Sequence, residues 1–409
     1  MKKKYVFIFV ILLAFIQVLE AQTGFNGGYD DSRALQNYDE SKVGTYTLPE
    51  LLKTQGGQTV STVEQWEKVR RPEILKLFED NVYGQVPKDY DDIQFKIRNT
   101  NKKAMGGKAT LKEVVITVYR NQRTATINLL TFTPNKVKKP VPVFLALNLR
   151  VRTMDVTRQN KDGYWPAEEV IEAGYGIAGF DVIDFAPNDQ EKFSQGVLDQ
   201  LYPEQLAMDN GMRTLGAWGW GLSRAIDYFE TDNSVDAAKV ITVGQSRGGK
   251  ASLWCGAQDQ RVAITIANNS GHAGAALSRR NFGETVQRIT TGFPHWFCPN
   301  YRQYADNEDK LPVDQHMLIG LIAPRAVYVA SAAEDLWADP KGEYLSLKEA
   351  QPVYRLYGFE TNLPEEMPEV NRQVIRPAMG YHKREGGHNL TLYDWQQFIR
   401  FANNWFKTK

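Results

Sequence analysis

The sequence predicts an α/β fold in which a mostly parallel central sheet carries helices on both faces, giving a three-layer sandwich. The 409 residues are 42% hydrophobic and 24% charged, a composition typical of a large globular protein with ample core. From about residue 174 onward, apolar strand-like runs alternate with helical stretches, as expected for a parallel sheet covered by helices. The sequence shows no internal repeat and no low-complexity tract. We therefore expect one large α/β domain over residues 91–409.

The first 21 residues differ in composition from the rest of the chain. Three lysines follow Met1, and residues 6–19 are apolar except for Gln17. This run has the length of a signal-peptide core, whereas a membrane-spanning helix needs about 20 apolar residues. We predict a signal peptide over residues 1–21, export to the periplasm or the extracellular space, and no membrane contact in the mature form. A retained membrane anchor is the alternative.

Charge and cysteine content narrow the class of protein. The chain has 49 basic and 48 acidic side chains, so no net field favours a polyanion, and we expect no nucleic-acid partner. A chain of this length buries enough surface to fold without a disulfide framework. The two cysteines, Cys255 and Cys298, are either a single supporting bridge or two thiols. We expect a monomer.

The elements are expected in the following order. Residues 22–61 are predicted to form an irregular arm. Residues 63–84 have helical spacing, and Pro72 should break or restart the helix. Residues 22–90 are thus predicted to form an arm and helices packed on the main domain. The predicted opening strands, at least partly antiparallel, cover residues 93–98, 112–119, 125–132 and 141–147. Later strands are predicted over 174–182, 239–244, 261–268, 325–332 and 379–383. Helices are predicted over 218–230, from Gly248 onward, near 344–357 and over 392–406.

The most informative segment lies where an apolar strand runs directly into a helix. Gly244-Gln245-Ser246-Arg247-Gly248 has the pattern G-x-S-x-G at this junction, where small residues relieve crowding around a strained nucleophile. The segment predicts that Ser246 is a nucleophile. The alternative is a tight turn in which Ser246 caps the helix.

A nucleophilic serine needs a base and an acid that orients the base, expected in the chain order Ser, Asp or Glu, His. His388 is our choice of base because two glycines precede it and the final helix follows, whereas His382 lies within a strand-like run and is predicted to be structural. Asp335, just after a predicted strand, is our choice of acid, and Glu334 is its local competitor. A solvated acidic loop is the alternative for both acids.

The backbone N–H of Arg247, at a helix N-terminus, is expected to stabilise the oxyanion. A second donor is expected near residues 148–152, although this segment lacks an HGG-type sequence. The Arg247 guanidinium is therefore a further candidate for the developing charge, with a surface arginine as the alternative.

Several segments together resemble one known family. They are GQSRGGK, NNSGHAGAALSRRNFGETV, HWFCPNYRQYADNEDKLPVDQHMLIGLIAPR, EDLWADPKGE, GGHNLT and the earlier RPEILKLFEDNVYG. The combination resembles the glucuronoyl esterases, carbohydrate esterase family fifteen, over most of the mature chain. The resemblance implies an α/β-hydrolase fold and cleavage of 4-O-methyl-glucuronic acid esters that join xylan to lignin.

Carried over by position, the resemblance assigns a role to each candidate. It makes Ser246 the nucleophile and His388 the base, it lets Arg247 assist the oxyanion, and it places three further side chains against the sugar: Lys250, Glu284 and Trp337.

The sequence departs from the family at two positions. Many members have the triad glutamate at the position of Asn269, and asparagine cannot act as the acid. Asp335 matches an alternative acid position of bacterial members, so a triad can still form. His272 stands where a small residue is commoner, and we interpret it as a loop histidine that packs near the site.

The chemistry of the three sugar-binding candidates fits these roles. An ammonium at Lys250 can donate to hydroxyls or to a carboxylate, Glu284 can accept from hydroxyls, and Trp337 offers a flat apolar face to pyranose C–H groups. The ordinary alternatives are a surface lysine, a helix-face glutamate and a core tryptophan. No H-E-x-x-H, C-x-x-C or phosphate-binding glycine loop occurs, and no metal or cofactor is implied.

These observations together predict an exported serine esterase acting on uronic acid esters of xylan. One alternative is another carbohydrate esterase, removing acetyl or feruloyl groups. The other is a non-catalytic polysaccharide-binding relative, which the asparagine at position 269 makes conceivable.

Overall fold

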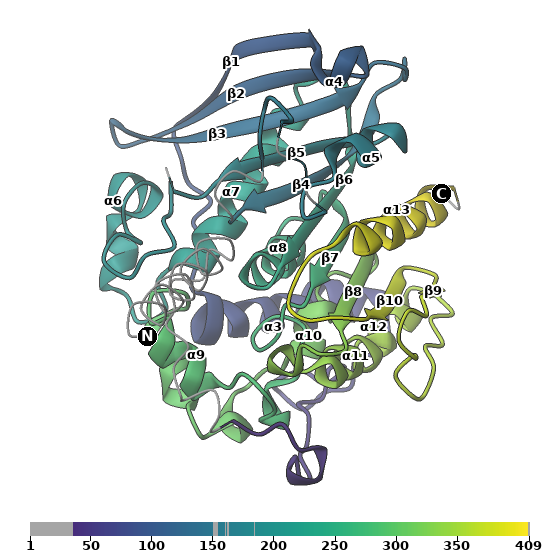
Figure 1. The fold of residues 1–409 in the computed structure, drawn as a ribbon. Coiled ribbons are helices and arrows are strands. Elements are labelled where there is room, and N and C mark those ends of the chain that lie inside the picture. The colour runs from purple at the N-terminus through teal and green to yellow at the C-terminus, as the bar shows by residue number, and fades with distance from the viewer. Residues whose placement is uncertain (1–35, 150–153, 160, 162, 184, 408–409) are drawn as a thin grey trace, which may run out of the picture.

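Ten strands form one sheet that runs through the whole molecule (Figure 1). The computed structural model describes residues 36–149, 154–159, 161, 163–183 and 185–407. The predicted signal peptide and the first part of the arm therefore lie outside the described residues. The strand order is β1-β2-β3-β5-β4-β6-β7-β8-β10-β9. In chain order the strands are β1 Asp92–Lys103, β2 Ala109–Arg120, β3 Arg123–Pro134, β4 Val141–Asn148, β5 Gly176–Asp181, β6 Val235–Gln245, β7 Val262–Asn268, β8 Ala326–Ala332, β9 Val374–Arg376 and β10 Met379–Arg384.

The sheet combines a parallel centre with antiparallel edges. Strands β5, β4, β6, β7, β8 and β10 pair in parallel, whereas β1, β2 and β3 form an antiparallel meander that joins β5, and β9 pairs antiparallel with β10. The β2–β3 hairpin turns at Asn121 and Gln122, both with positive φ, as the right-handed twist of a two-residue hairpin requires. The predicted mostly parallel sheet with antiparallel opening strands is confirmed.

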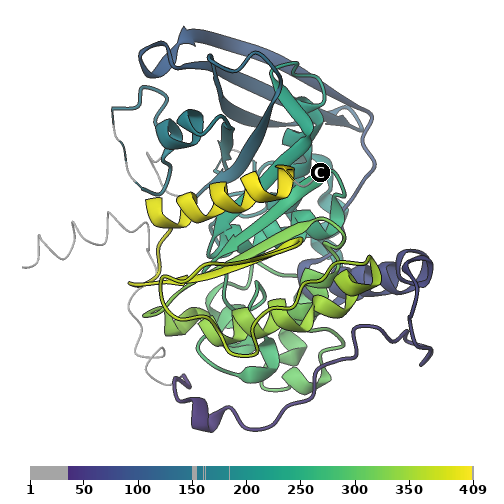
Figure 2. The same cartoon turned by 90° about the vertical axis from the view of Figure 1, so that its right-hand side faces the viewer.

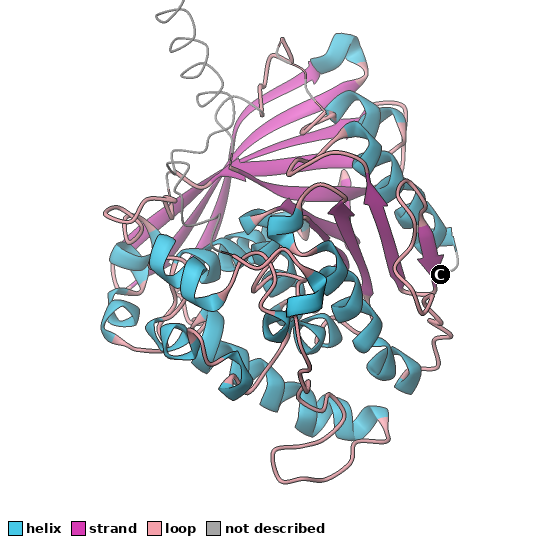
Figure 3. Ribbon diagram, turned by 60° about the horizontal axis from the view of Figure 1, so that its bottom comes forward, coloured by secondary structure: helices cyan, strands magenta, loops and turns pink. Residues whose placement is uncertain are grey.

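Helices cover both faces of the sheet, as Figures 2 and 3 show. Tyr328 of β8 packs against Phe398 and Phe401 on one face, whereas Ser331 of the same strand bonds Glu343 on the other. Residues at odd separations on a strand point to opposite faces. The helix Leu392–Lys407 (α13), which carries the two phenylalanines, and the helix Pro340–Glu349 (α11), which carries Glu343, therefore lie on opposite sides of the sheet. The α-helices are α2 Val63–Gln65, α3 Arg71–Phe78, α4 Ala104–Gly107, α5 Ala167–Glu172, α6 Val197–Leu201, α7 Thr214–Phe229, α8 Arg247–Gln258, α9 Val286–Gly292, α10 Gln315–Gly320, α11 Pro340–Glu349, α12 Gln351–Leu356 and α13 Leu392–Lys407.

Prolines account for two features of the helices. Pro72 lies in the first turn of α3, directly after the single-turn π-helix Trp66–Arg70, so the helical segment restarts there as predicted. The helical stretch predicted near residues 344–357 is confirmed, but it consists of two helices, α11 and α12, which are separated at Ala350. Pro352 lies in the first turn of α12. Inside one continuous helix its ring would clash with the preceding turn and its missing N–H would remove a hydrogen bond, so the chain starts a new helix there.

Two further expectations can be compared with the structure. Cys255 and Cys298 are both free thiols buried in separate surroundings, so the alternative of a disulfide between them is wrong. Burial raises the pKa of both thiols, which keeps them protonated and unreactive. Across the described part of the chain, the helices lack the combination of length and apolar character needed to cross a membrane.

Candidate active site

Ser246 sits on a sharp turn between the end of β6 and the start of α8. Its backbone has φ 58° and ψ −127°, a region that a non-glycine residue occupies only under constraint. A Cβ at Gly244 would lie 2.1 Å from the carbonyl oxygen of Gly248, and a Cβ at Gly249 would lie 2.9 Å from the Cβ of Ser270. Glycine is thus sterically required on both sides of the serine, as in a nucleophile elbow.

His388 and Asp335 form the short contact expected of a base and its orienting acid. Nδ1 of His388 lies 2.6 Å from Oδ2 of Asp335. The carboxylate is buried, with 5% of the residue exposed, whereas the imidazole is about one third exposed. Glu334, the competing acid, lies on the surface of the same loop. The geometry therefore selects Asp335 over Glu334 as the partner of His388.

The loops that carry these two side chains hold each other in place. The backbone N–H of Ala333 donates to the carbonyl of Arg384, and that of Glu334 donates to the carbonyl of Gly386. The Arg384 guanidinium donates to the carbonyls of Gly387 and Asn389, on both sides of the histidine, at 3.0 and 2.5 Å. Gly386 has φ 83°, the sharp bend anticipated from the paired glycines.

Asn269 is a contact that sequence reasoning missed. Its Nδ2 donates to Oδ2 of Asp335 at 2.8 Å, so one carboxylate oxygen accepts hydrogen bonds from both the asparagine and the histidine. The backbone of Asn269 has φ 43° and donates to the carbonyl of Ala330 at 2.7 Å. Asparagine therefore supports the acid from the position at which the resemblance to the family had led us to look for the acid itself. The sequence did differ from the family pattern at position 269, but that difference indicated only that the acid lies elsewhere.

The two histidines interpreted as structural are paired inside the protein. His382 is completely buried between the hydroxyl of Tyr328 and the carboxylate of Asp394, at 2.9 and 2.8 Å. His272 lies 2.9 Å from the hydroxyl of Tyr301, and burial lowers the pKa of His272 to about 3. A histidine that stays neutral at this depth packs near the site and takes no proton from a substrate.

All seven residues predicted for the site line one cavity of about 820 Å³ at the carboxyl ends of the parallel strands. This is the size and the place expected of a ligand site in an α/β fold. Polar and charged side chains share its wall with aromatic rings. The lining includes Ser246, Arg247, Lys250, Asn269, Glu284, Phe293, Trp296, Asp335, Trp337 and His388.

Lys250 and Glu284 form a buried ion pair in the cavity wall, with Nζ and Oε2 3.0 Å apart. Nζ of Lys250 also donates to the carbonyls of Ser270 and His272 at 2.7 and 2.6 Å, which uses all three ammonium hydrogens. The expectation of an ammonium free to donate to sugar hydroxyls therefore does not match the structure. Lys250 holds the carboxylate of Glu284, and Trp337 is tied to Glu284 through its backbone carbonyl.

The oxyanion donors are partly described. Arg247 is the first residue of the 12-residue helix α8, so its N–H lies at the positive end of the helix dipole beside Ser246. The Arg247 guanidinium lies 6.0 Å from the ring centre of Trp296. The second donor was expected near residues 148–152, and residues 150–152 lie outside the described residues.

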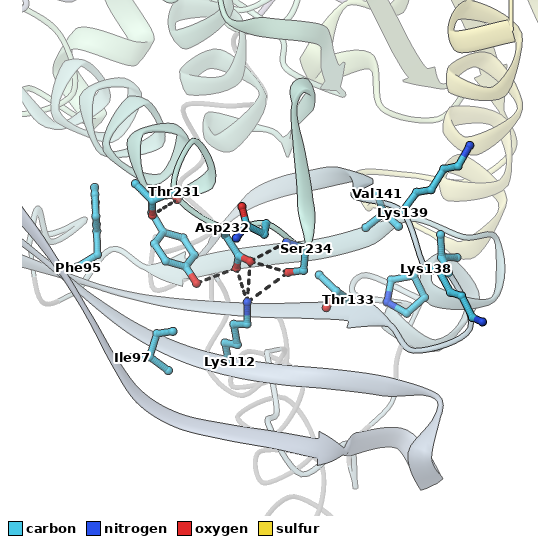
Figure 4. A pocket seen from close by; sticks show the side chains of 14 residues that line it. Phe95, Ile97, Lys112, Thr133, Lys138, Lys139, Val141, Thr231, Asp232 and Ser234 are labelled. Atoms are coloured by element: carbon cyan, nitrogen blue, oxygen red, sulfur yellow. Dashed lines mark hydrogen bonds and ion pairs between the residues drawn. The ribbon is translucent and has the colours of Figure 1, made fainter.

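A second cavity, of about 600 Å³, lies next to the starts of β4 and β6 and is also lined by residues of β1, β2 and β3 (Figure 4). Its central charges satisfy each other, because Nζ of Lys112 donates to both oxygens of Asp232 at 2.6 and 2.7 Å and to Ser234 at 3.2 Å. The hydroxyl of Tyr228 also donates to Asp232 at 2.8 Å. None of the site residues predicted from the sequence lines this second cavity.

The fold, the elbow and the location of the cavity define an α/β hydrolase. Comparison with known proteins narrows the class further. The family model for fungal glucuronyl esterases matches residues 116–358. The carbohydrate esterase MZ0003, from an unknown prokaryotic organism, is 42% identical over 398 residues, covering 90% of this chain and 91% of the relative.

Solved structures give the same result. A promiscuous esterase of carbohydrate esterase family 15 from a marine bacterial metagenome is 41% identical, with a TM-score of 0.83 over 90% of this chain and 99% of that one. A glucuronoyl esterase from Solibacter usitatus is 36% identical, with a TM-score of 0.81 over 90% and 100%. The chain belongs to the glucuronoyl esterase family, carbohydrate esterase family 15, and is a carboxylic ester hydrolase, as the resemblance in the sequence had implied.

Proposed function

We propose that the protein is a serine esterase that hydrolyses esters of glucuronic acid or 4-O-methyl-glucuronic acid carried on xylan, and so cleaves bonds between lignin and carbohydrate. The observation that carries the proposal is the 2.6 Å contact between His388 and Asp335 in the cavity that also contains Ser246. Relatives described as 4-O-methyl-glucuronoyl methylesterases support the substrate. One from Schizophyllum commune is 27% identical over 365 residues.

The chemistry follows from the residues in the cavity. The hydroxyl oxygen of Ser246 attacks the ester carbonyl while His388 accepts the hydroxyl proton, and Asp335 stabilises the imidazolium that forms. The oxygen that becomes negative lies toward the N-terminus of α8, where the N–H of Arg247 donates to it. The C–O bond to the alcohol then breaks, and His388 returns the proton to the alcohol oxygen.

A water molecule completes the cycle by attacking the acyl-enzyme with His388 again as base. The bond between the acyl carbon and the oxygen of Ser246 breaks, Ser246 recovers its proton, and the uronic acid is released. In this proposal the Lys250–Glu284 pair presents a fixed carboxylate to sugar hydroxyls, and Trp337 contacts the pyranose face. The aromatic wall of Phe293 and Trp296, stacked at 3.9 Å, is available to an aromatic alcohol.

Export is part of the same proposal, because a polymeric substrate cannot enter the cell. The monomeric state expected from the sequence also remains a proposal. The predicted signal peptide supports the export. The domain boundaries proposed from the sequence, 22–90 for the arm and helices and 91–409 for the catalytic domain, also remain proposals.

The substrate is tested by comparing hydrolysis of benzyl glucuronate with deacetylation of an acetylated xylan. The proposal expects a clear preference in kcat/KM for the uronate ester. Equal or reversed activity would favour an acetyl xylan or feruloyl esterase, which the promiscuity named for the metagenomic relative keeps as the second candidate. Absence of hydrolysis on either substrate, with binding of xylan retained, would favour a non-catalytic polysaccharide-binding protein.

A further inference from the structure

We infer that Glu343 of α11 is a positioning residue for both halves of the active site, the catalytic acid and the sugar-binding ion pair. It acts through the bridge loop, the name used here for residues 269–272. The inference rests on the proposed roles of Asp335 and Glu284, but the contacts that carry it do not depend on the substrate.

The carboxylate of Glu343 is completely buried directly behind the cavity. Its Oε1 accepts hydrogen bonds from the backbone N–H groups of Ser270 and Gly271 at 2.7 and 3.0 Å, and from the Ser270 hydroxyl at 3.1 Å. Its Oε2 accepts from the hydroxyl of Ser331 on β8 at 2.7 Å. A buried carboxyl group that accepts from four donors fixes those donors, because each would lose its partner if the carboxyl group moved.

The bridge loop has functional contacts on both sides of this anchor. At its start, Asn269 donates to the Asp335 oxygen that also bonds His388. In its middle and at its end, the carbonyls of Ser270 and His272 accept from Lys250, the partner of Glu284. A displacement of the loop would therefore disturb the acid and the ion pair together.

The backbone of the bridge loop does not hold this shape by itself. Asn269 has φ 43° and Gly271 has φ 62°. Ala273, the first residue after the bridge loop, has φ 53°. Non-glycine residues occupy this strained region only where their surroundings impose it. The two backbone N–H groups that donate to Glu343 belong to Ser270 and Gly271, between Asn269 and Ala273. Together with the bond from Asn269 to Ala330, the carboxyl group of Glu343 therefore helps to impose the conformation.

The geometry predicts an unusual order of side chains at position 343. Glutamine keeps the length of the side chain and one oxygen for Ser270 and Gly271, and the Ser331 hydroxyl can rotate to accept from the new amide. Aspartate keeps the carboxyl group but is one methylene shorter, so the same oxygen cannot reach the loop. A positioning role therefore expects Glu343→Gln to be close to the wild type and Glu343→Asp to be defective, whereas a role of the charge alone expects the reverse.

The experiment measures kcat and KM of the full chain on benzyl glucuronate and on p-nitrophenyl acetate. We expect Glu343→Asp to lower kcat on both esters by about 10- to 100-fold, because a displacement of about 1 Å at the triad has this effect. We expect KM to rise only for benzyl glucuronate, which alone uses the Lys250–Glu284 pair. Glu343→Gln should remain within about threefold on both esters.

A matched control separates positioning from stability. Leu347 lies one turn further along α11, is fully buried, and forms part of the hydrophobic core. Leu347→Ala should lower the melting temperature at least as much as Glu343→Asp while leaving kcat and KM unchanged. If Glu343→Asp resembles Leu347→Ala in all three quantities, the positioning role is overturned.

A spectroscopic measurement keeps the inference separate from the proposed function. The proton between Nδ1 of His388 and Asp335 should give a far-downfield NMR signal in the free protein, whatever the substrate. The signal should persist in Glu343→Gln and Leu347→Ala and shift or disappear in Glu343→Asp. If the wild type shows the signal but hydrolyses no uronate ester, the proposed substrate fails and the inference stands. If the signal is unchanged in Glu343→Asp, the inference fails.

Discussion

Replacement of Asp335 by asparagine is the perturbation whose effect follows most directly from the site. One carboxylate oxygen of Asp335 accepts from His388 at 2.6 Å and from Asn269 at 2.8 Å. The residue is buried, with only 5% of its surface exposed. In Asp335→Asn, an amide nitrogen facing His388 cannot accept its proton, and an amide oxygen facing it carries no charge to stabilise the imidazolium. Either orientation therefore removes the support of the base.

The magnitude is set by that loss in the transition state. In a serine protease triad the same change lowers kcat by about 10⁴, which corresponds to about 5.5 kcal/mol of transition-state stabilisation. We expect a reduction of about 10³- to 10⁴-fold here, with KM for benzyl glucuronate changed far less, because Asp335 touches the base rather than the sugar.

The assay is steady-state hydrolysis of benzyl glucuronate, with a thermal melt to show that the variant is folded. Glu334→Gln is the matched control, because it removes the neighbouring charge from an exposed position on the same loop. It should retain nearly full activity. A folded Asp335→Asn variant with kcat within tenfold of the wild type would refute the assignment of the acid.

The other predictions concern stability and its dependence on pH. Burial lowers the pKa of His272 to about 3 in the folded protein, against 6.5 in the unfolded chain, so the unfolded chain binds the extra proton between these values. The free energy of unfolding should therefore fall by about 1.4 kcal/mol per pH unit as the pH drops from 6.5 toward 3. Denaturant titrations of His272→Asn should show a shallower dependence on acid, and a dependence equal to that of the wild type would contradict this prediction. Lys250→Met leaves Glu284 buried without its cation and should lower the free energy of unfolding by about 3–5 kcal/mol. A loss below about 1 kcal/mol would mean that the pair is not buried in solution. Glu40→Gln removes a half-exposed carboxylate that pairs with Arg280 and Lys341, and it should lower the free energy of unfolding by less than about 1 kcal/mol. A larger loss in the same titration would show that the arm is essential to the fold.

The parts of the fold that follow from local sequence were predicted well. The junction of an apolar strand with Gly244, Ser246 and Gly248 indicates an elbow because the steric requirement is local, and the structure shows the crowding that glycine relieves there. The alternation of strands and helices also predicted the layers, since each element shows its buried face in its own period. The break between α11 and α12 was missed although Pro352 was visible, because a proline in the first turn of a helix leaves the neighbouring helical spacing intact.

The individual contacts that support the site across long stretches of chain could not be predicted. Asn269 and Asp335 are 66 residues apart, and only the pairing of β7 with β8 brings them together. The same holds for Lys250, whose three partners lie 20 to 34 residues away. Glu343 gave no sequence signal, because a buried carboxylate in a helix is indistinguishable from an exposed one until its donors are placed.

The central claim is that Ser246 is the nucleophile of an esterase acting on uronic acid esters. Hydrolysis of benzyl glucuronate by the wild type and by Ser246→Ala tests it most directly, because the alanine variant keeps the cavity, the base and the acid and loses only the attacking oxygen. The account predicts an active wild type and a folded variant whose kcat is lower by about 10⁵- to 10⁶-fold, as for removal of a triad serine elsewhere. A folded Ser246→Ala protein that hydrolyses the ester at the wild-type rate would contradict it.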